Sequence, residues 1–497
     1  MAMTGTTDLF AHYRPHPADE VVGPDGVVRE GYRSVVPALQ ELGGVGLATA
    51  VGEMGRERRA RGVVFGSFVD GALVEHPFPV DPLPRLLAAD EWDTVARGVE
   101  QRTRALNAFL ADAYRPTGRR RGDGRDAAPE AVRAGVLPGW LVTRSPGYRP
   151  AAVSLAWPGQ QRAAVAGLDL LRTAEGWVVL EDNLRVPSGL GYAIVNRDST
   201  RAALPALYAD RAGLAEPSEA VAVLRAALAD AAPPACDGPP QLALLTDGRV
   251  NTAWFEHRLL AEAMGIPVAT PDRLWATPEG GVAVEVDGER VSVDVLYRRF
   301  DDDDLAAHLN PVGTPLDVLL GGAVRAGRLA LANVPGNGVA DDKATYCHVP
   351  AMIRFYLGEE PLLPSVPTWV LADEGDLAAV RGRLGELVVK PVDGYGGQGV
   401  VFGPSCSAAE LAELTAQVEA APHRFVAQEP VDFSTLPTLV DGVVAPRRVD
   451  LRVFAVAGST TRAVRAPLTR VALEEGSLLV NSSRGGGSKD TWILPPR

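Results

Sequence analysis

The chain has 497 residues, of which 46% are hydrophobic and 22% are charged, which is ordinary for a soluble globular protein and enough for roughly two to four domains. The formal net charge of −13 argues against a nucleic-acid partner, because binding to a polyanion depends on clustered positive charge. The sequence shows no run of about 18 apolar residues and no basic-then-apolar N-terminal signal, so we expect a cytoplasmic protein that does not enter a membrane.

The first predicted segment, residues 1–135, is partly helical. Between Asp90 and Tyr114, apolar residues such as Val95, Val99 and Leu106 recur at helical spacing. We interpret this stretch as a helix that packs against the rest of the protein.

The second predicted segment, residues 136–215, contains a hairpin with polar side chains. Strand side chains alternate between faces, so Glu181 and Asn183 point the same way, and Asp169 lies on the preceding strand. Oxygen-only sites of this kind suit Mg²⁺, with Mn²⁺ as an alternative, together with substrate phosphates. A surface hairpin with solvated acids is the other interpretation, but the apolar run from Val178 to Leu180 indicates a buried strand, where carboxylates need partners. We therefore predict that Asp169, Glu181 and Asn183 are metal ligands.

The third predicted segment, residues 216–340, alternates strands and helices. A short helix from Ser218 to Ala231 precedes a proline-rich linker at residues 233–240. Apolar strands and a helix then alternate from Leu242 to Tyr297, a pattern that predicts a small α/β layer with a mostly parallel sheet.

Two polar clusters in this segment admit more than one interpretation. The acidic run from Asp301 to Asp304 suggests a metal site, yet a helix N-terminus is favoured, because successive acids point in different directions. Arg298 and Arg299 reach either a carboxylate substrate or phosphates, or they form ion pairs with the acidic run. The three cysteines, Cys236, Cys347 and Cys406, are far apart without metal-ligand spacing, and we expect reduced thiols.

The fourth predicted segment, residues 341–497, carries a strand with Lys390, a glycine-dense turn and a second apolar strand. Glycines let backbone N–H groups approach a polyphosphate, and the lysine supplies a fixed positive charge beside it. The turn glycines are Gly394, Gly396, Gly397 and Gly399. An ordinary hairpin loop explains the glycines equally well when they are considered alone.

Together these motifs resemble a circularly permuted type 2 ATP-grasp protein. Lys343 after two aspartates is similar to the entry of the ATP-grasp domain, and Lys390 with its glycine turn resembles the strand and flap over the triphosphate. The hinge that pairs with adenine is identified at Gln428, Glu429, Pro430 and Val431. The positions that serve the phosphates and an acyl phosphate in ribosomal-protein glutamate ligases correspond to Arg452, Arg470 and Asn481. In an unpermuted ligase the metal motif would follow, but here it lies at Asp169, Glu181 and Asn183, well upstream.

The resemblance covers nearly the whole chain, including stretches without obvious chemistry such as Gln101-Arg102 and Asn107. It implies an α/β (α+β) protein with a circularly permuted ATP-grasp fold, a pre-ATP-grasp α/β domain and an N-terminal partly helical segment. If the permutation is real, the strand of Glu181 must share a sheet with the strand of Arg452. The C-terminal stretch from Trp492 to Leu494 should then lie close to the start of the strand at Gly167.

The resemblance also implies a reaction. ATP-dependent carboxylate–amine ligases form an amide or peptide bond through an acyl phosphate and release ADP and phosphate. The expected partners are small-molecule or peptide carboxylates and amines, and a homo-oligomer is left open. The alternatives are a small-molecule kinase on the same scaffold and a nucleotide-binding partner that has lost catalysis.

Overall fold

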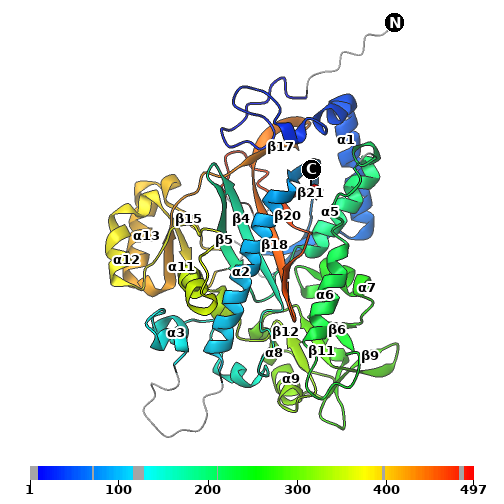
Figure 1. The fold of residues 1–497 in the computed structure, drawn as a ribbon, viewed down its shortest axis with the longest axis vertical. Coiled ribbons are helices and arrows are strands. Elements are labelled where there is room, and N and C mark those ends of the chain that lie inside the picture. The colour runs from blue at the N-terminus through cyan, green and yellow to red at the C-terminus, as the bar shows by residue number, and fades with distance from the viewer. Residues whose placement is uncertain are drawn as a thin grey trace.

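The computed structural model describes residues 9–69, 72–115, 128–209, 211–394, 398–478, 480 and 486–496. The protein has a mixed α/β fold (Figure 1). Its described residues form five sheets: a large central sheet, a four-stranded parallel sheet, a four-stranded antiparallel sheet, a three-stranded antiparallel sheet and a two-stranded antiparallel sheet. Among the described residues, no helix combines the length and the apolar character needed to cross a membrane.

The central sheet joins segments from both ends of the chain. It has eight strands, with the main order β3-β21-β20-β18-β4-β5 and with β17 and β19 paired to β18. The strands are β3 (Val80–Leu87), β4 (Val165–Thr173), β5 (Gly176–Asn183), β17 (Thr435–Val440), β18 (Val443–Ala457), β19 (Thr461–Ala463), β20 (Leu468–Val471) and β21 (Gly487–Ile493). Arg452 on β18 pairs with Asp169 on β4, and Asp169 pairs with Glu181 on β5. The prediction that the Glu181 and Arg452 strands share one sheet is therefore confirmed.

The β4–β5 hairpin follows directly from the local sequence. Gly176 has φ 127° at the turn, a conformation that L side chains rarely adopt. A bulge lies between Asp169 and Leu170, and beyond it Glu181 and Asn183 share the face of the sheet on which Asp169 lies. Asp182, between them, points to the opposite face.

Helices cover both faces of the central sheet. Apolar residues of α2 (Ala89–Ala113) pack against Leu168 of β4 and Val453 of β18 in one core cluster. On the other face, α5 (Leu190–Ala203) and α6 (Glu219–Asp230) share a cluster with Phe454. In Figure 1, α2 runs along β4 and β18, while α1 (Val36–Arg61) lies beside α5 at the edge of the molecule. The predicted helix from Asp90 to Tyr114 is confirmed as α2, and the apolar residues Val95, Val99, Leu106, Phe109 and Leu110 are fully buried.

The small parallel sheet matches the predicted α/β layer. Its order is β12-β11-β6-β7, and every neighbouring pair is parallel. The strands are β6 (Leu242–Leu245), β7 (Val268–Ala269), β11 (Val295–Arg298) and β12 (Ala330–Ala332), with α7 (Trp254–Met264), α8 (Asp302–Ala307) and α9 (Leu316–Arg325) around them. A three-stranded antiparallel sheet beside this layer consists of β8 (Leu274–Ala276), β9 (Val282–Val286) and β10 (Glu289–Val293).

The four-stranded antiparallel sheet has its own core, and its order is β13-β16-β14-β15. In Figure 1, α12 (Glu374–Val380) and α13 (Ala408–Ala420) lie on one side of this sheet, and α11 (Lys343–Met352) lies on the other. The strands are β13 (Thr368–Val370), β14 (Val388–Pro391), β15 (Val401–Phe402) and β16 (Phe425–Gln428). The remaining elements are β1 (Val64–Val69), β2 (Ala72–Pro77), α3 (Glu130–Arg133), α4 (Trp140–Thr143) and α10 (Gly338–Asp341).

The end of the chain lies in the central sheet, but not beside β4. The antiparallel pairings place the end of β21 at the same end of the sheet as the start of β4. However, β20 and β18 lie between the two strands, and β21 pairs in parallel with β3 instead. Trp492–Leu494 therefore lies at the same end of the sheet as the start of the Gly167 strand, as expected, but the two strands are not neighbours.

Candidate active site

Two lysines from separate elements line one pocket with the Glu181 carboxylate of β5, and Lys343 contacts it directly. Lys343 is the first residue of α11, and its Nζ lies 2.9 Å from Oε1 of Glu181. The same Nζ donates a hydrogen bond to the carbonyl of Gly394 in the glycine turn. Lys390 lies on β14 and donates to Oε1 of Gln428. Lys343, Lys390, the start of the glycine turn and Glu181 of the predicted metal motif thus lie in one region.

A cavity of about 290 Å³, open to solvent, lies between these groups. Its lining residues are Leu180, Glu181, Asp182, Asp341, Lys343, Tyr346, Thr368, Lys390, Val426 and Gln428. The charged groups thus share the cavity with apolar side chains that suit a planar ring. Small-molecule sites commonly combine a few polar groups with an apolar lining.

The charges in the cavity influence one another. Burial, with a smaller contribution from the neighbouring Lys343, lowers the pKa of Lys390 to about 8. Burial alone would raise the pKa of Glu181, but Lys343 and Lys390 outweigh it, and the pKa is lowered. Both lysines therefore stabilise the carboxylate form of Glu181.

Asp169 forms the centre of a second charged cluster, next to the first. Arg452 binds it through two hydrogen bonds of 2.7 Å, and Arg470 lies 2.9 Å away. Although burial would raise the pKa of Asp169, these two guanidinium groups lower it to about 2. Arg470 also pairs with Asp450 on β18, so two carboxylates fix its orientation. The predicted residues Asp169, Arg452 and Arg470 are brought together.

The oxygen ligands on the hairpin differ in access. Glu181 has 29% of its side chain exposed, whereas Asp169 has 3% and is bonded by two arginines. Nδ2 of Asn183 lies 3.5 Å from Oδ2 of Asp169, so the three side chains are neighbours. Among the His, Cys, Asp and Glu residues that the structure describes, no group of three or more is arranged to hold a metal ion. An ion here would draw on Glu181, on Asn183 and on phosphate oxygens, a donor set that fits Mg²⁺.

The glycine turn is described only at its borders. Gly394 contacts Lys343, and Gly399 has φ 68° with Pro391 so close that a Cβ would lie 2.8 Å from its Cγ. Gly396, Gly397 and the predicted catalytic Asn481 lie outside the described residues.

The predicted hinge lies at the edge of the cavity. Nε2 of Gln428 donates to Thr368 Oγ1 at 2.9 Å, and the backbone N–H of Glu429 donates to the Pro367 carbonyl at 2.9 Å. The Glu429 carboxylate lies 3.1 Å from Arg383. Pro430 is exposed and Val431 is half-buried. Gln428 is therefore the hinge side chain that faces the lysines.

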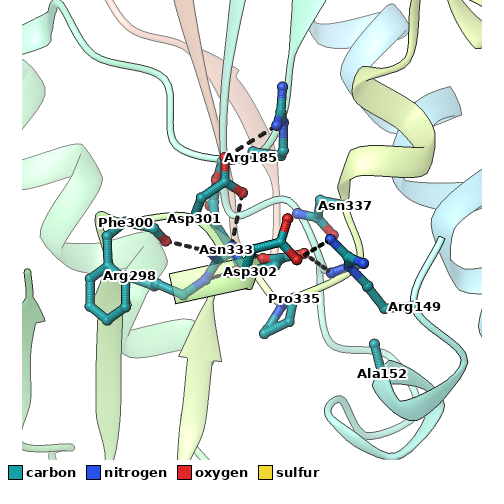
Figure 2. Close-up of polar contacts among 12 residues, drawn as sticks. Arg149, Ala152, Arg185, Arg298, Phe300, Asp301, Asp302, Asn333, Pro335 and Asn337 are labelled. Carbon is teal, nitrogen blue, oxygen red and sulfur yellow. Dashed lines mark hydrogen bonds and ion pairs between the residues drawn. The ribbon is translucent and has the colours of Figure 1, made fainter. Parts of the chain in front are cut away.

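The acidic run caps a helix, as the sequence favoured. Asp301 is the N-cap of α8 and accepts a hydrogen bond from the N–H of Asp302 at 2.8 Å. Figure 2 shows Arg185 reaching Asp301, with an N–O distance of 3.1 Å. Arg298 is buried and lies 2.8 Å from Asp302, so the ion-pair interpretation of Arg298 fits the structure. Arg299 pairs instead with Glu256 at 3.1 Å and donates to the Pro187 carbonyl.

Sequence reasoning missed the asparagines that anchor the hairpin. Asn333 has φ 56°, and its side chain bonds both the N–H and the carbonyl of Val165 at 2.8 and 2.7 Å. It also donates to the Leu184 carbonyl at 3.1 Å, and Asn337 donates to the same carbonyl at 3.1 Å. These two residues thus tie the start of β4 to the end of β5. An isolated asparagine carries no sequence signal for such a role, because its partners are far away along the chain.

Comparisons with known proteins agree with this geometry. The model of the family "Circularly permuted ATP-grasp type 2" matches residues 84–472. A Frankia casuarinae protein named "Putative glutamate--cysteine ligase 2-2" is 46% identical over 98% of this chain and 54% of its own length. An uncharacterised protein of Mycobacterium tuberculosis (strain ATCC 25618 / H37Rv) is 41% identical over 99% of this chain and 86% of its own length.

A solved structure supports the same fold. The glutathione synthetase-like effector of Globodera pallida, in its apo form, has a TM-score of 0.55 with 12% identity and covers 90% of this chain and 97% of its own. The chain spans about half the length of the Frankia relatives that it matches, at 54% of each.

Proposed function

Since the chain belongs to the circularly permuted ATP-grasp type 2 family, we propose that it is an ATP-dependent carboxylate–amine ligase that forms an amide or peptide bond and releases ADP and phosphate. The observation that carries the proposal is the convergence of Lys343, Lys390 and Glu181 on one cavity. These residues come from three separate elements, and a chain that had lost catalysis would have no need to retain all of them.

The charges support phosphoryl transfer to a carboxylate. A carboxylate oxygen of the acid substrate attacks the γ-phosphorus, the new O–P bond forms, and the bond to the β-phosphate oxygen breaks to release ADP. This step brings two anions together, so it needs positive charge on both sides of the transferred group. Lys343 and Lys390 supply it from one side of the cavity, and Arg452 and Arg470 supply it from the sheet.

The acyl phosphate is then the activated acid. The amine nitrogen attacks the acyl carbon, the C–N bond forms, the C–O bond to phosphate breaks, and the amine proton passes to phosphate or solvent. The arginines that neutralise the γ-phosphate in the first step neutralise the leaving phosphate in the second. One set of fixed charges therefore serves both steps without rearranging.

Magnesium fits this scheme through the hairpin oxygens. Glu181 and Asn183 would hold the ion with phosphate oxygens, and a bound ion would neutralise phosphate charge. Asp169 would lie next to the ion, and it orients Arg452 and Arg470. Manganese meets the same oxygen preference.

The substrates are proposed only as a class. The Frankia relatives carry the name of a glutamate–cysteine ligase, which favours an amino acid or a short peptide as acid or amine. Because this chain spans 54% of their length, the part that gives them this name need not be the part that they share with it.

A product assay tests the proposal. The protein is incubated with MgATP, pairs of amino acids or peptides, and hydroxylamine, which traps an acyl phosphate as a hydroxamate. We expect ADP and phosphate that depend on the acid, and a hydroxamate in place of the amide when the amine is omitted. AMP with pyrophosphate would contradict the scheme, and a stable phosphoester would indicate a kinase.

A further inference from the structure

We propose that Arg102 on α2 and Asp182 on β5 form a positioning pair that sets the orientation of Glu181 and Asn183. The inference rests on the proposed function, because it concerns how the metal and nucleotide groups are held. Arg102 belongs to a sequence motif for which neither the family resemblance nor the reaction scheme supplies a role.

The pair lies directly behind the candidate ligands. Asp182 stands between Glu181 and Asn183 on β5 and faces the opposite side of the sheet, toward α2. Both of its oxygens accept hydrogen bonds from Arg102, at 2.6 and 2.8 Å, and each side chain is 1% exposed. A bidentate guanidinium–carboxylate contact fixes angle as well as distance, so it fixes the backbone between the two ligands.

Arg102 also holds the other walls of the cavity. Its Nη1 donates to Ser365 Oγ at 2.9 Å, and its guanidinium lies 5.1 Å from the centroid of the Tyr346 ring. Tyr346 lines the cavity, and it accepts a hydrogen bond from the N–H of Val366 at 2.7 Å. One side chain on α2 therefore contacts the metal strand, the α11 wall and the segment that leads into β13.

The neighbouring residues of the same motif support this function of α2. Gln101 donates to the Glu360 carbonyl at 2.8 Å and accepts from the N–H of Leu362 at 2.9 Å. Asn107 accepts from the N–H of Ala163 at 2.9 Å and donates to its carbonyl at 3.1 Å, just before β4. The helix thus fastens the beginning of β4, the end of β5 and the approach to β13 through polar contacts.

A purely structural role is the competing explanation, and the chain offers a matched control. Arg197 on α5 pairs with Asp490 at 2.7 Å, with side chains that are 2% and 1% exposed. It donates to the carbonyls of Ala215 and Thr491 as well, so it makes three hydrogen bonds, the same number as Arg102. Its partner strand β21 is separated from β5 by β20, β18 and β4. Arg102→Lys and Arg197→Lys therefore each replace a buried guanidinium that makes three hydrogen bonds, while keeping the positive charge.

The test measures binding of Mn²⁺ in the presence of the non-hydrolysable analogue β,γ-imido-ATP, by electron paramagnetic resonance, together with thermal unfolding. Loss of a partner outside the ligand shell typically weakens metal affinity about 10- to 100-fold, and we expect roughly a tenfold loss for Arg102→Lys. Arg197→Lys should unfold at a similarly reduced temperature but bind Mn²⁺ like the wild type. Asp182→Asn, which keeps the shape, should show the same loss of affinity and provides the readout if Arg102→Lys does not fold.

The outcomes separate the two proposals. Wild-type Mn²⁺ affinity in a folded Arg102→Lys or Asp182→Asn variant overturns the positioning pair alone. An equal loss in Arg197→Lys also overturns it, because the effect would then be general destabilisation. If the wild type shows no metal-dependent nucleotide binding at all, the proposed function fails and this inference fails with it.

Discussion

The two halves of the candidate site are held in different ways. The β4–β5 hairpin belongs to the central sheet, and buried polar groups from α2, from β18 and from Asn333 bond to it. Lys390 stands on β14, in a small sheet with a separate core cluster that includes Leu371, Val389 and Ala427. On one side β14 pairs with β16 along its whole length, but on the other side it pairs only at Val388 and Val389 with the two-residue strand β15.

This difference suggests two functions: the hairpin positions the ligands, and Lys390 supplies positive charge. The hairpin side chains are already satisfied by protein partners, so their geometry exists before any ligand arrives, and changing them disturbs the fold as well as the site. Among the residues that the structure describes, Lys390 has one hydrogen-bonded side-chain partner, Gln428, and it lies half-buried at the cavity. Changing it should affect the reaction and leave the fold intact.

Asp169→Asn should have the largest effect. The substitution removes a carboxylate that is 3% exposed and leaves Arg452 and Arg470 without their shared counter-charge. Breaking a buried ion pair on one side costs roughly 3 kcal/mol of unfolding free energy, and misplaced arginines should also slow ADP formation. Chemical denaturation and a steady-state ADP assay check both effects. If unfolding free energy stayed at the wild-type value, the hairpin would not be the preorganised half.

Lys390→Met should separate activity from stability. Removing one preorganised charge-stabilising group typically lowers turnover about 10²- to 10³-fold, roughly 3 kcal/mol in the transition state. Because methionine keeps the apolar stem of the lysine, we expect the unfolding temperature to stay within a few degrees of the wild type. Turnover measured beside thermal unfolding checks this, and Arg381→Met, an exposed cation on the same subdomain that pairs with Glu419, is the control. A large loss of stability would erase the contrast between the halves.

The sequence predicted the parts of this contrast that depend on local patterns. Helical spacing found α2, and strand alternation found the common face of Glu181 and Asn183. The resemblance to a permuted ATP-grasp protein predicted that β5 and β18 share a sheet. Local patterns are sufficient there because side-chain periodicity and turn chemistry involve neighbours along the chain.

Contacts between distant residues could not be predicted in the same way. Asp182 lies between two candidate ligands, but its partner Arg102 is 80 residues away on a helix. The pairing of β21 with β3 joins opposite ends of the chain. Trp492–Leu494 was expected close to the start of β4, and it lies at the same end of the sheet with β20 and β18 in between. Asn333 has a positive φ, which asparagine adopts more readily than most residues, but its partner Val165 is 168 residues away along the chain.

The charge of Lys390 gives a third test, through pH. Burial lowers its pKa to about 8, so the ammonium form that attracts a polyphosphate is lost as the pH rises through 8. Nucleotide affinity should therefore fall above this pH, by at most tenfold per pH unit, as titration calorimetry can measure. Stability follows the opposite sign: an unfolded lysine has a pKa of about 10.4, so between about pH 8 and 10.4 the unfolded chain binds more protons and this residue's contribution to stability rises with pH.

Lys390→Arg is the control for that pH dependence, because a guanidinium stays charged throughout the range. Its nucleotide affinity should be nearly independent of pH between about 7 and 10. If the variant and the wild type lost affinity in parallel, the titrating group would be another residue and the lysine would carry its charge at all these pH values.

The smallest predicted effect concerns the hydrogen bonds that orient the Lys390 side chain. Thr368 accepts a hydrogen bond from Gln428 at 2.9 Å and donates one to the Val366 carbonyl at 2.8 Å, and Gln428 in turn accepts from Lys390. Thr368→Val keeps the shape but frees the Gln428 amide to rotate, so the lysine loses a fixed acceptor. One net hydrogen bond is worth about 1 kcal/mol, which corresponds to roughly a fivefold loss of nucleotide affinity in calorimetry.

Thr415→Val on α13 is the control. It removes a hydroxyl that donates to the Leu411 carbonyl at 2.8 Å in the same subdomain, and it should leave the affinity unchanged. If both variants lost affinity equally, the effect would come from the subdomain as a whole, and the chain from Thr368 through Gln428 to Lys390 would have no separate role.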